Sequence, residues 1–241
     1  MQITVSPTIG SFVANDYRTA SVFQKYGIDF CCKGGRTIDE VCEANNLLPE
    51  SLLKELNEVL TTSSNEGIDF KTWPLDLLAD YIEKKHHRYV QESIPPIKQF
   101  LDKLCRVHGG RHPELFEINE EFSASASELT MHMNKEEMIL FPHIRRMVES
   151  KNGKGKAQAP AFGTVRNPIQ MMMHEHDTEG ERFRKIAELS NNYQAPDDGC
   201  TTYRVAFAMI QEFESDLHLH IHLENNILFP KAIELEQTLQ N

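Results

Sequence analysis

The amino-acid sequence predicts an all-α protein: an antiparallel four-helix bundle that follows a small N-terminal helical domain. Three observations predict this class. No stretch alternates apolar and polar residues for long enough to suggest a sheet. From Trp73 onward, long segments carry apolar stripes that step by three and four residues. The phrase HMNKEEMILFP, which begins at His132, returns as HIHLENNILFP at His220, so a helical segment is repeated.

The chain is expected to divide into three parts, because its composition changes twice. Residues 1–62 form the N-terminal helical domain, residues 63–73 a linker and residues 74–241 the bundle. Within the first domain, helix start and stop signals follow one another along the chain. They are a cap at Asn15 or Asp16, a stop at Gly27, the loop IDFCCKGGR, a capping box of Thr37 with Glu40, and an opening at Pro49.

Four long helices are expected in the bundle, joined by polar or glycine-containing loops. Their ranges are about 74–105, 113–149, 168–192 and 202 to near the C-terminus. Pro95 and Pro96 should kink the first helix, and Pro230 should kink the fourth. Asn167 is expected to cap the third helix, which then starts at Pro168.

Six candidate ligands interrupt the apolar stripes of the four helices. They are His87, His132, Glu136, His176, His220 and Glu224. In two of the helices a His and a Glu stand four residues apart, so both lie on one helix face. The first His precedes the second by 45 residues, and the third precedes the fourth by 44. The chain therefore reads as two helical hairpins, each donating two His and one Glu to the interior.

A metal centre explains all six residues together, since six buried polar groups without partners would be costly. Four imidazoles and two carboxylates suit two ions, and this donor set favours iron or manganese over a thiolate zinc site. We therefore expect two non-haem irons per chain, bridged by Glu136 and Glu224 and by an oxide or hydroxide. Open positions would remain for a small ligand.

Several neighbours of these residues are candidates for supporting roles. Glu128 lies one turn before His132, and Glu175 adjoins His176, so either could orient a ligand or relay protons. Glu137 and Asn225, which follow the two candidate bridging residues, could support the ligands in the same way. His86 competes with His87, and the stripe favours His87. The remaining histidines are expected to be solvated, supporting or without a role: His108, His112, His143, His174, His218 and His222.

Cys31 and Cys32 stand side by side in the loop of the N-terminal domain. Lys33 and Arg36 lie close by, so these cations could lower a thiol pKa and make a cysteine reactive. A thiol pair could serve redox chemistry or hold an iron in transit; the alternative is two idle, buried thiols. Two other cysteines look structural: Cys105 and Cys200.

Charge and composition exclude several function classes. A formal net charge of −11 argues against non-specific binding to nucleic acid or to anionic membranes. The sequence has neither an apolar run long enough for a membrane helix nor the pattern of a signal peptide. Five cysteines, an odd number without an export signal, favour a reducing cytoplasm.

The sequence resembles the repair-of-iron-centres family of bacterial di-iron proteins. The motifs are GIDFCCKGG, HHRYVQESIP, HMNKEEMILFP, HEHDTEG and HLENNILFP, in the expected order over almost the whole chain. The resemblance implies an ScdA-type N-terminal domain, a hemerythrin-like bundle and the same six iron ligands, with the family's paired cysteines at Cys31 and Cys32. It also implies repair of iron–sulfur clusters after oxidative or nitrosative stress, by nitric oxide reduction or iron donation.

The implied partners are NO or O2, damaged iron–sulfur proteins and an electron donor that the sequence does not identify. Three alternatives stay open. The first is a hemerythrin-like carrier or sensor of oxygen or NO. The second is a ferritin-like oxygenase, disfavoured because imidazoles outnumber carboxylates here. The third is a structural zinc bundle.

Overall fold

The computed structural model describes residues 7–61, 68–155 and 160–240. Within these ranges the backbone forms helices, turns and loops, and an isolated β-bridge pairs Thr8 with Thr37. The predicted all-α class is therefore confirmed. Part of the predicted linker, residues 63–67, lies outside the described residues, and the rest, residues 68–73, contains the short helix η2 (Phe70–Thr72).

The N-terminal domain consists of short helices. They are α1 (Ile9–Asn15), η1 (Tyr17–Thr19), α2 (Ala20–Lys25), α3 (Ile38–Ala44) and α4 (Pro49–Thr61). Asp16 caps η1 through its side chain, whereas Asn15 ends α1, a helix that the sequence analysis missed. Gly27 follows α2 with φ +64°, a conformation that glycine adopts readily. The predicted capping box of Thr37 and Glu40 is present at α3.

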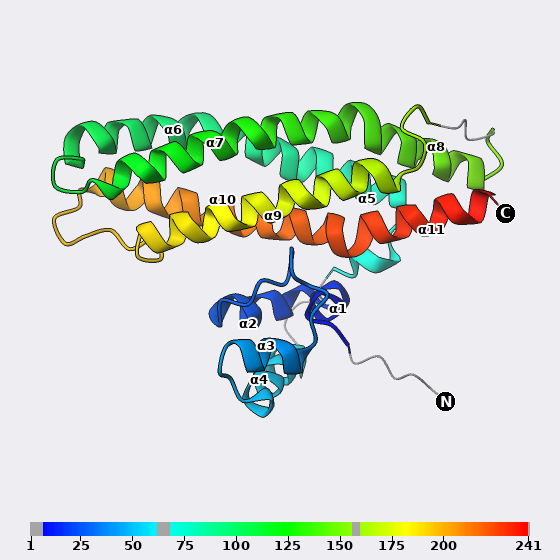
Figure 1. Cartoon of the computed structure of the whole chain (residues 1–241), viewed down its shortest axis with the longest axis horizontal. Coiled ribbons are helices and arrows are strands. Elements are labelled where there is room, and N and C mark those ends of the chain that lie inside the picture. The colour runs from blue at the N-terminus through cyan, green and yellow to red at the C-terminus, as the bar shows by residue number, and fades with distance from the viewer. Residues whose placement is uncertain (1–6, 62–67, 156–159, 241) are drawn as a thin grey trace.

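The bundle contains four long helical rods, three of which include π-helical turns. The first rod is α5 (Leu75–Tyr81), η3 (Ile82–His87) and α6 (Arg88–His108); the second is α7 (Glu114–Lys135), η4 (Glu136–Leu140) and α8 (Phe141–Lys151). The third is α9 (Arg166–Leu189), and the fourth is α10 (Thr201–Leu223), η5 (Glu224–Leu228) and α11 (Phe229–Gln240). The first rod lies beside the second and fourth, and the second lies beside the third (Figure 1).

Two of the π-helical turns end two residues before a proline of the repeated ILFP phrase. Pro142 follows η4 and Pro230 follows η5. A proline has no N–H, and its ring crowds the carbonyl four residues earlier, so a wider turn relieves the contact. The sequence predicted a kink at Pro230, and the structure has this π-helical turn there. Pro95 and Pro96 lie inside α6, which continues through them.

The start of α9 differs from the prediction. Val165, not Asn167, holds the cap position. The backbone N–H of Val165 donates to Glu236 Oε1 at 2.9 Å, so a carboxylate from α11 satisfies an N–H group at the helix start. The side chain of Asn167 instead donates to the carbonyl of Phe162 at 2.8 Å. This cap comes from a residue 71 positions away, which sequence spacing does not reveal.

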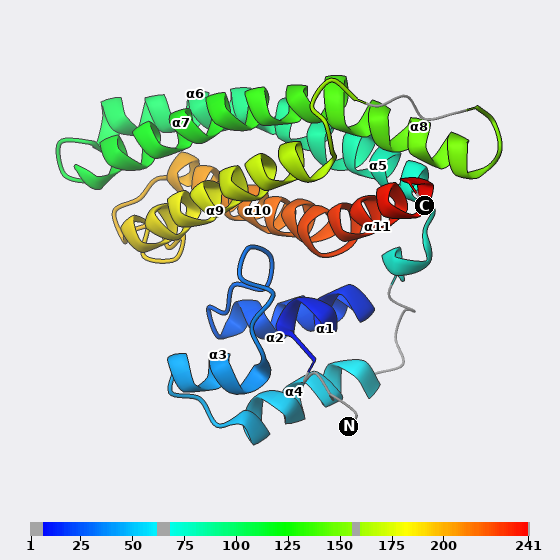
Figure 2. The ribbon, with the colours of Figure 1, turned by 45° about the vertical axis from the view of Figure 1, so that its right-hand side comes forward.

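Buried apolar residues form two clusters along the bundle. One, around Leu101, Phe122 and Phe213, continues into the N-terminal domain. The other, around Phe141 and Phe229, fills the opposite end, where α5, α8 and α11 meet. The loop between α2 and α3 reaches from the N-terminal domain toward the bundle (Figures 1 and 2). Among the described helices, none combines the length and apolar character that crossing a membrane requires.

Candidate metal centre

Six polar side chains lie in the bundle interior between the two apolar clusters. They are the six residues that the sequence predicts as ligands: His87, His132, Glu136, His176, His220 and Glu224. Each is no more than 3% exposed. All four rods contribute, and two of the π-helical turns begin at a ligand candidate, Glu136 or Glu224. The structure therefore brings the whole predicted set together.

Each carboxylate lies between two imidazoles. Glu136 Oε2 is 3.3 Å from Nε2 of His87 and 3.3 Å from Nε2 of His132. Glu224 contacts the other two histidines. Its Oε1 is 3.0 Å from His220 Nε2, and its Oε2 is 3.1 Å from His176 Nε2.

Donor atoms gather in two overlapping groups, in each of which they lie within 4.8 Å of one another. One group is His87, Glu136, His220 and Glu224; the other is His132, His176 and Glu224. The first rod therefore pairs its histidine with that of the fourth, and the second rod pairs its histidine with that of the third. Each imidazole pair comes from both sequence hairpins, so neither hairpin could complete a group alone.

Several buried polar atoms of the centre lack hydrogen-bond partners, and they indicate whether a cation fits there. Neither carboxylate oxygen of Glu136 has a hydrogen-bond partner, and Glu224 Oε2 and His87 Nε2 also lack one. Burial and the neighbouring carboxylate raise the pKa of Glu136, but the imidazoles, first that of His132, lower it further, and the net shift is downward. Two buried anions side by side require positive charge between them. The donor set thus fits divalent cations.

Two of the four imidazoles, those of His87 and His132, carry that positive charge when no cation is present. Burial lowers the pKa of His87, yet the neighbouring carboxylates of Glu136 and Glu224 raise it to about 10. The pKa of His132 is likewise raised to about 10, against burial, by Glu136 and Glu175. Protons on Nε2 therefore stand where a cation would bind, and binding one would release them.

Three ligand candidates are oriented through their second ring nitrogen. The Nδ1 atoms of His87, His132 and His176 each lie 2.8 Å from a polar partner: Glu137, Glu175 and Asn225 respectively. Such contacts fix the ring and aim Nε2 at the centre. These are three of the four supporting residues that the sequence suggested. The fourth, Glu128, is exposed and pairs with Arg182 at 3.1 Å.

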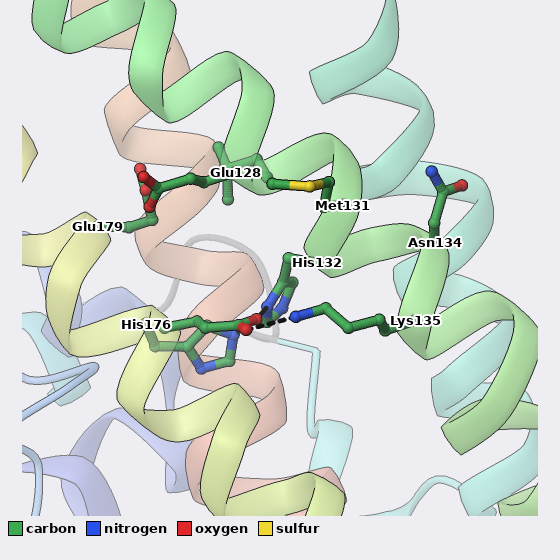
Figure 3. Close-up of a pocket in the computed structure, with 9 residues that line it drawn as sticks. Glu128, Met131, His132, Asn134, Lys135, His176 and Glu179 are labelled. Carbon is green, nitrogen blue, oxygen red and sulfur yellow. Dashed lines mark hydrogen bonds and ion pairs between the residues drawn. The ribbon is translucent and has the colours of Figure 1, made fainter.

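A pocket of about 670 Å³ opens between α7 and α9, beside the centre. His132 and His176 line it together with Glu128, Glu175 and Glu179 (Figure 3). Glu175 also pairs with Lys135, and its hydrogen bond to His132 is the main cause that lowers its pKa to about 2. Glu175 is therefore a fixed anion, which can accept a proton only transiently.

Glu179 is the acidic residue that the sequence analysis missed. It is 3% exposed, and Ser125 Oγ donates to its Oε2 at 2.6 Å, while its Oε1 has no hydrogen-bond partner. Burial raises its pKa. Among the acids that line the pocket, Glu179 is thus the one best suited to hold a proton. Its position three residues after His176, on the same helix face, was the available signal.

The cysteine loop lies against the outside of the centre. Cys32 Sγ donates to the backbone carbonyl of His176 at 3.4 Å, and the side chains of Asn225 and Asn226 donate to the carbonyl of Cys31 at 3.3 Å. The expected lowering of a thiol pKa does not occur at Cys31. Its contact with Cys32, its burial and the nearby Asp29 carboxylate all raise its pKa.

The other histidines take different positions. His86 is fully buried, contacts Asp216 at 3.0 Å and stacks on the ring of His220. His174 is exposed, as expected. His222, in contrast, is 1% exposed and packs edge-on against Phe30 of the N-terminal domain. It was expected to be solvated or supporting, because the docking of the N-terminal domain was not foreseen.

Buried imidazoles and carboxylates at the centre of a four-helix bundle define a cation-binding protein of the hemerythrin type. In agreement, residues 78–232 match the hemerythrin HHE cation binding domain. Residues 5–60 match ScdA_N, which is described as a domain of unknown function. Both ranges fall within the domains predicted from the sequence.

Whole proteins match as well. The chain is 33% identical over 229 residues to the iron-sulfur cluster repair protein YtfE of Yersinia pseudotuberculosis (serotype O:1b, strain IP 31758), covering 95% of this chain and 97% of the relative. Identity and coverage are the same for YtfE of Yersinia pestis (strain Pestoides F). The chain therefore belongs to the family of these proteins, and the resemblance found in the sequence is confirmed.

Proposed function

We propose that the six interior residues hold two non-haem irons, with Glu136 and Glu224 as bridging carboxylates, and that the protein repairs damaged iron–sulfur clusters. The observation that carries the proposal is the set of buried carboxylate oxygens without hydrogen-bond partners, surrounded by four imidazoles. The printed name of the relatives supports the repair role. The free state of all five cysteines supports a reducing, cytoplasmic setting.

The first form of this function is reduction of nitric oxide to nitrous oxide. Two NO molecules, two electrons and two protons give one N2O and one water. A reduced pair of irons would supply the electrons and the open positions. The chain supplies the surroundings: the pocket beside His132 and His176 admits a small molecule, and Glu179, buried and able to hold a proton, lies within it.

The second form is iron delivery to a damaged cluster through the cysteine loop. Ligand atoms of Asp29, Cys31 and Cys32 lie within 4.8 Å of one another, so the loop offers a second, softer donor set. The contact of Cys32 with the backbone of His176 places this set directly outside the centre. In this form the iron is cargo, and the loop is its exit.

Metal analysis with Mössbauer spectroscopy on the iron-loaded full chain tests the proposal. We expect about two coupled irons per chain, lost or uncoupled in Glu136→Ala, Glu224→Ala and His176→Ala. His174→Ala is the matched control, because this exposed histidine lies on the same helix and should retain the iron. Bound zinc, or full iron retention in the ligand variants, would contradict the proposal.

Anaerobic addition of NO to the reduced protein separates the two forms. Production of nitrous oxide, reduced in Glu179→Gln but not in Glu181→Gln, supports NO reduction; Glu181 is exposed on the same helix. Coupled irons without nitrous oxide favour delivery. In that case a Cys31→Ala/Cys32→Ala variant should restore clusters in an acceptor protein more slowly than the wild type. Equal restoration would contradict the exit role of the loop.

A further inference from the structure

A second cluster of polar side chains lies at the loop end of the bundle, where α6 ends and α10 begins. Cys200, an exposed residue, caps the N-terminus of α10, and its Sγ is 3.3 Å from Nε2 of His108, the last residue of α6. The sequence alone predicts a structural role for Cys200 and none for His108. At about 1.5 Å per helical residue, Cys200 is about 30 Å from His220, far from the metal centre.

His108 is held in place by burial. The side chain is 6% exposed, and the edge of its ring packs on Tyr203 at a centroid distance of 5.5 Å. Its Nδ1 has no hydrogen-bond partner, so the polar contact of the ring is the one made by Nε2 with the thiol. A buried imidazole aimed at an exposed sulfur is the arrangement that activates a cysteine.

The charged groups around the pair are already neutralised. Asp198 contacts His112 at 2.9 Å and Arg111 at 3.0 Å, and Glu114 contacts the other nitrogen of His112 at 3.0 Å. These paired acids do not oppose a thiolate at Cys200. Within the described residues, the cluster does not bring three donor atoms within 4.8 Å of one another, so it is not arranged to hold a metal.

We propose that Cys200 and His108 form a reactive thiol site that takes up low-molecular-weight disulfides as a mixed disulfide. The Cys200 thiolate attacks one sulfur of the disulfide, whose S–S bond breaks as the new S–S bond forms. Cys200 is oxidised, and the departing sulfur is reduced and leaves as a thiolate that takes up a proton. His108 accepts the thiol proton on Nε2 and stabilises the thiolate by a hydrogen bond; it acts as a positioning residue.

The thiol pKa values agree with this geometry. His108, followed by the N–H groups of Tyr203 and Thr202, lowers the pKa of Cys200 to about 7. At Cys105, which is half-buried and donates to the carbonyl of Leu115, burial raises the pKa instead. Cys105 therefore serves as an internal reference for the reaction of Cys200.

The test is peptide-resolved mass spectrometry of the full chain after short exposure to oxidised glutathione, or to iodoacetamide, between about pH 5.5 and 9. We expect Cys200 to react faster than Cys105, with half-maximal rate near the pH where its thiolate forms rather than near the ordinary value of about 8.5. His108→Phe should slow the reaction about tenfold at pH 6.5, because one pKa unit is a factor of ten in thiolate. His174→Phe, which changes an exposed histidine on α9 instead, should leave it fast.

Two outcomes would overturn the proposal. One is a Cys200 profile with its midpoint at or above the ordinary thiol value. The other is a rate no greater than that of Cys105. Both are read from the wild-type protein, so they decide the matter even if His108→Phe does not fold.

Discussion

Buried polar side chains in this protein differ in whether another protein group satisfies them. Glu236 is 8% exposed but accepts hydrogen bonds from the backbone of Val165 and the hydroxyl of Thr164, so it stabilises a helix start. Glu136 is fully buried and accepts none. The hydrogen-bonding capacity of the Glu236 carboxylate is satisfied by protein groups, whereas the Glu136 carboxylate requires a partner that the protein does not provide.

Glu214, on α10, is a partly buried acid whose charge opposes folding. Burial raises its pKa to about 7. Between about pH 4.5 and 7 the unfolded chain loses this proton before the folded chain does, so the folded state binds more protons and the free energy of unfolding falls as pH rises. Glu214→Gln should therefore be more stable than the wild type at pH 8, by on the order of 1–3 kcal/mol.

Urea denaturation at pH 4 and pH 8 measures this effect. The stabilisation should vanish at pH 4, where both states hold the proton. Glu212→Gln, which changes an exposed acid on the same helix, is the control and should leave stability unchanged at both values. Equal stability of Glu214→Gln and wild type at pH 8 would show that Glu214 ionises without cost.

The sequence located the six ligand candidates because they share the phase of long apolar stripes. Glu179 shares the face of His176 as well, but it was missed because its burial depends on Ser125 of another helix. The burial of His86 was not predicted for the same reason, because its partner Asp216 lies 130 positions away. The helical face on which a residue lies can be predicted from its own segment, whereas its contacts with residues of other helices cannot.

At the scale of elements, π-helical turns are the feature that shapes the centre. Glu136 and Glu224 each begin such a turn, and Pro142 and Pro230 lie in the first turn of the α-helices that follow. The wider turn changes the direction of the carboxylate relative to the histidine four residues earlier. The sequence predicts a bend at Pro230 but does not distinguish it from a π-helical turn, because both relieve the same proline contact.

Removing either proline tests this role. Pro142→Ala or Pro230→Ala should let the preceding turn return toward α-helical hydrogen bonding and displace Glu136 or Glu224. We expect helical content to be retained while iron is lost to a chelator about tenfold faster, the scale of effect seen when ligands lose their support. Pro96→Ala, inside α6 and away from a π-helical turn, is the control. Unchanged iron release in both variants would contradict the idea.

At the scale of the whole molecule, the N-terminal domain covers α9 and α10 beside the metal centre. Arg184 pairs with Asp29 at 3.0 Å across this contact, and Phe30 packs against His218 and His222. The sequence predicted both domains but not their contact, since the residues that meet are far apart in the chain and carry no shared pattern. The burial of His222 follows from the contact alone.

The cysteine loop approaches α9 closely at Gly180. A Cβ at this position would lie 3.2 Å from Cys32 Sγ, so Gly180→Ala should push the loop outward. Alanine favours the helix over glycine by about 1 kcal/mol, so the bundle should not lose stability. We expect maleimide to label Cys31, which is 3% exposed, several-fold faster in this variant.

Gly110→Ala is the matched control for this experiment, because an added Cβ there meets nothing within 4 Å. It should leave the labelling rate of Cys31 unchanged. A Gly180→Ala protein with the labelling rate of the wild type would indicate that the loop adjusts locally and stays in place.

The apolar core is divided into two clusters, and the metal centre lies between them, so it can couple the unfolding of one cluster to that of the other. One cluster joins most of the N-terminal domain to half of the bundle, and the other holds α5, α8 and α11 together with Ala14 of α1. Without metal, the charged layer between the two clusters weakens their coupling, so each cluster can unfold locally without the other. With metal, the ligands of all four rods are connected through the centre. Amide hydrogen exchange should therefore report two opening free energies in the metal-free protein and one, higher value once iron is bound.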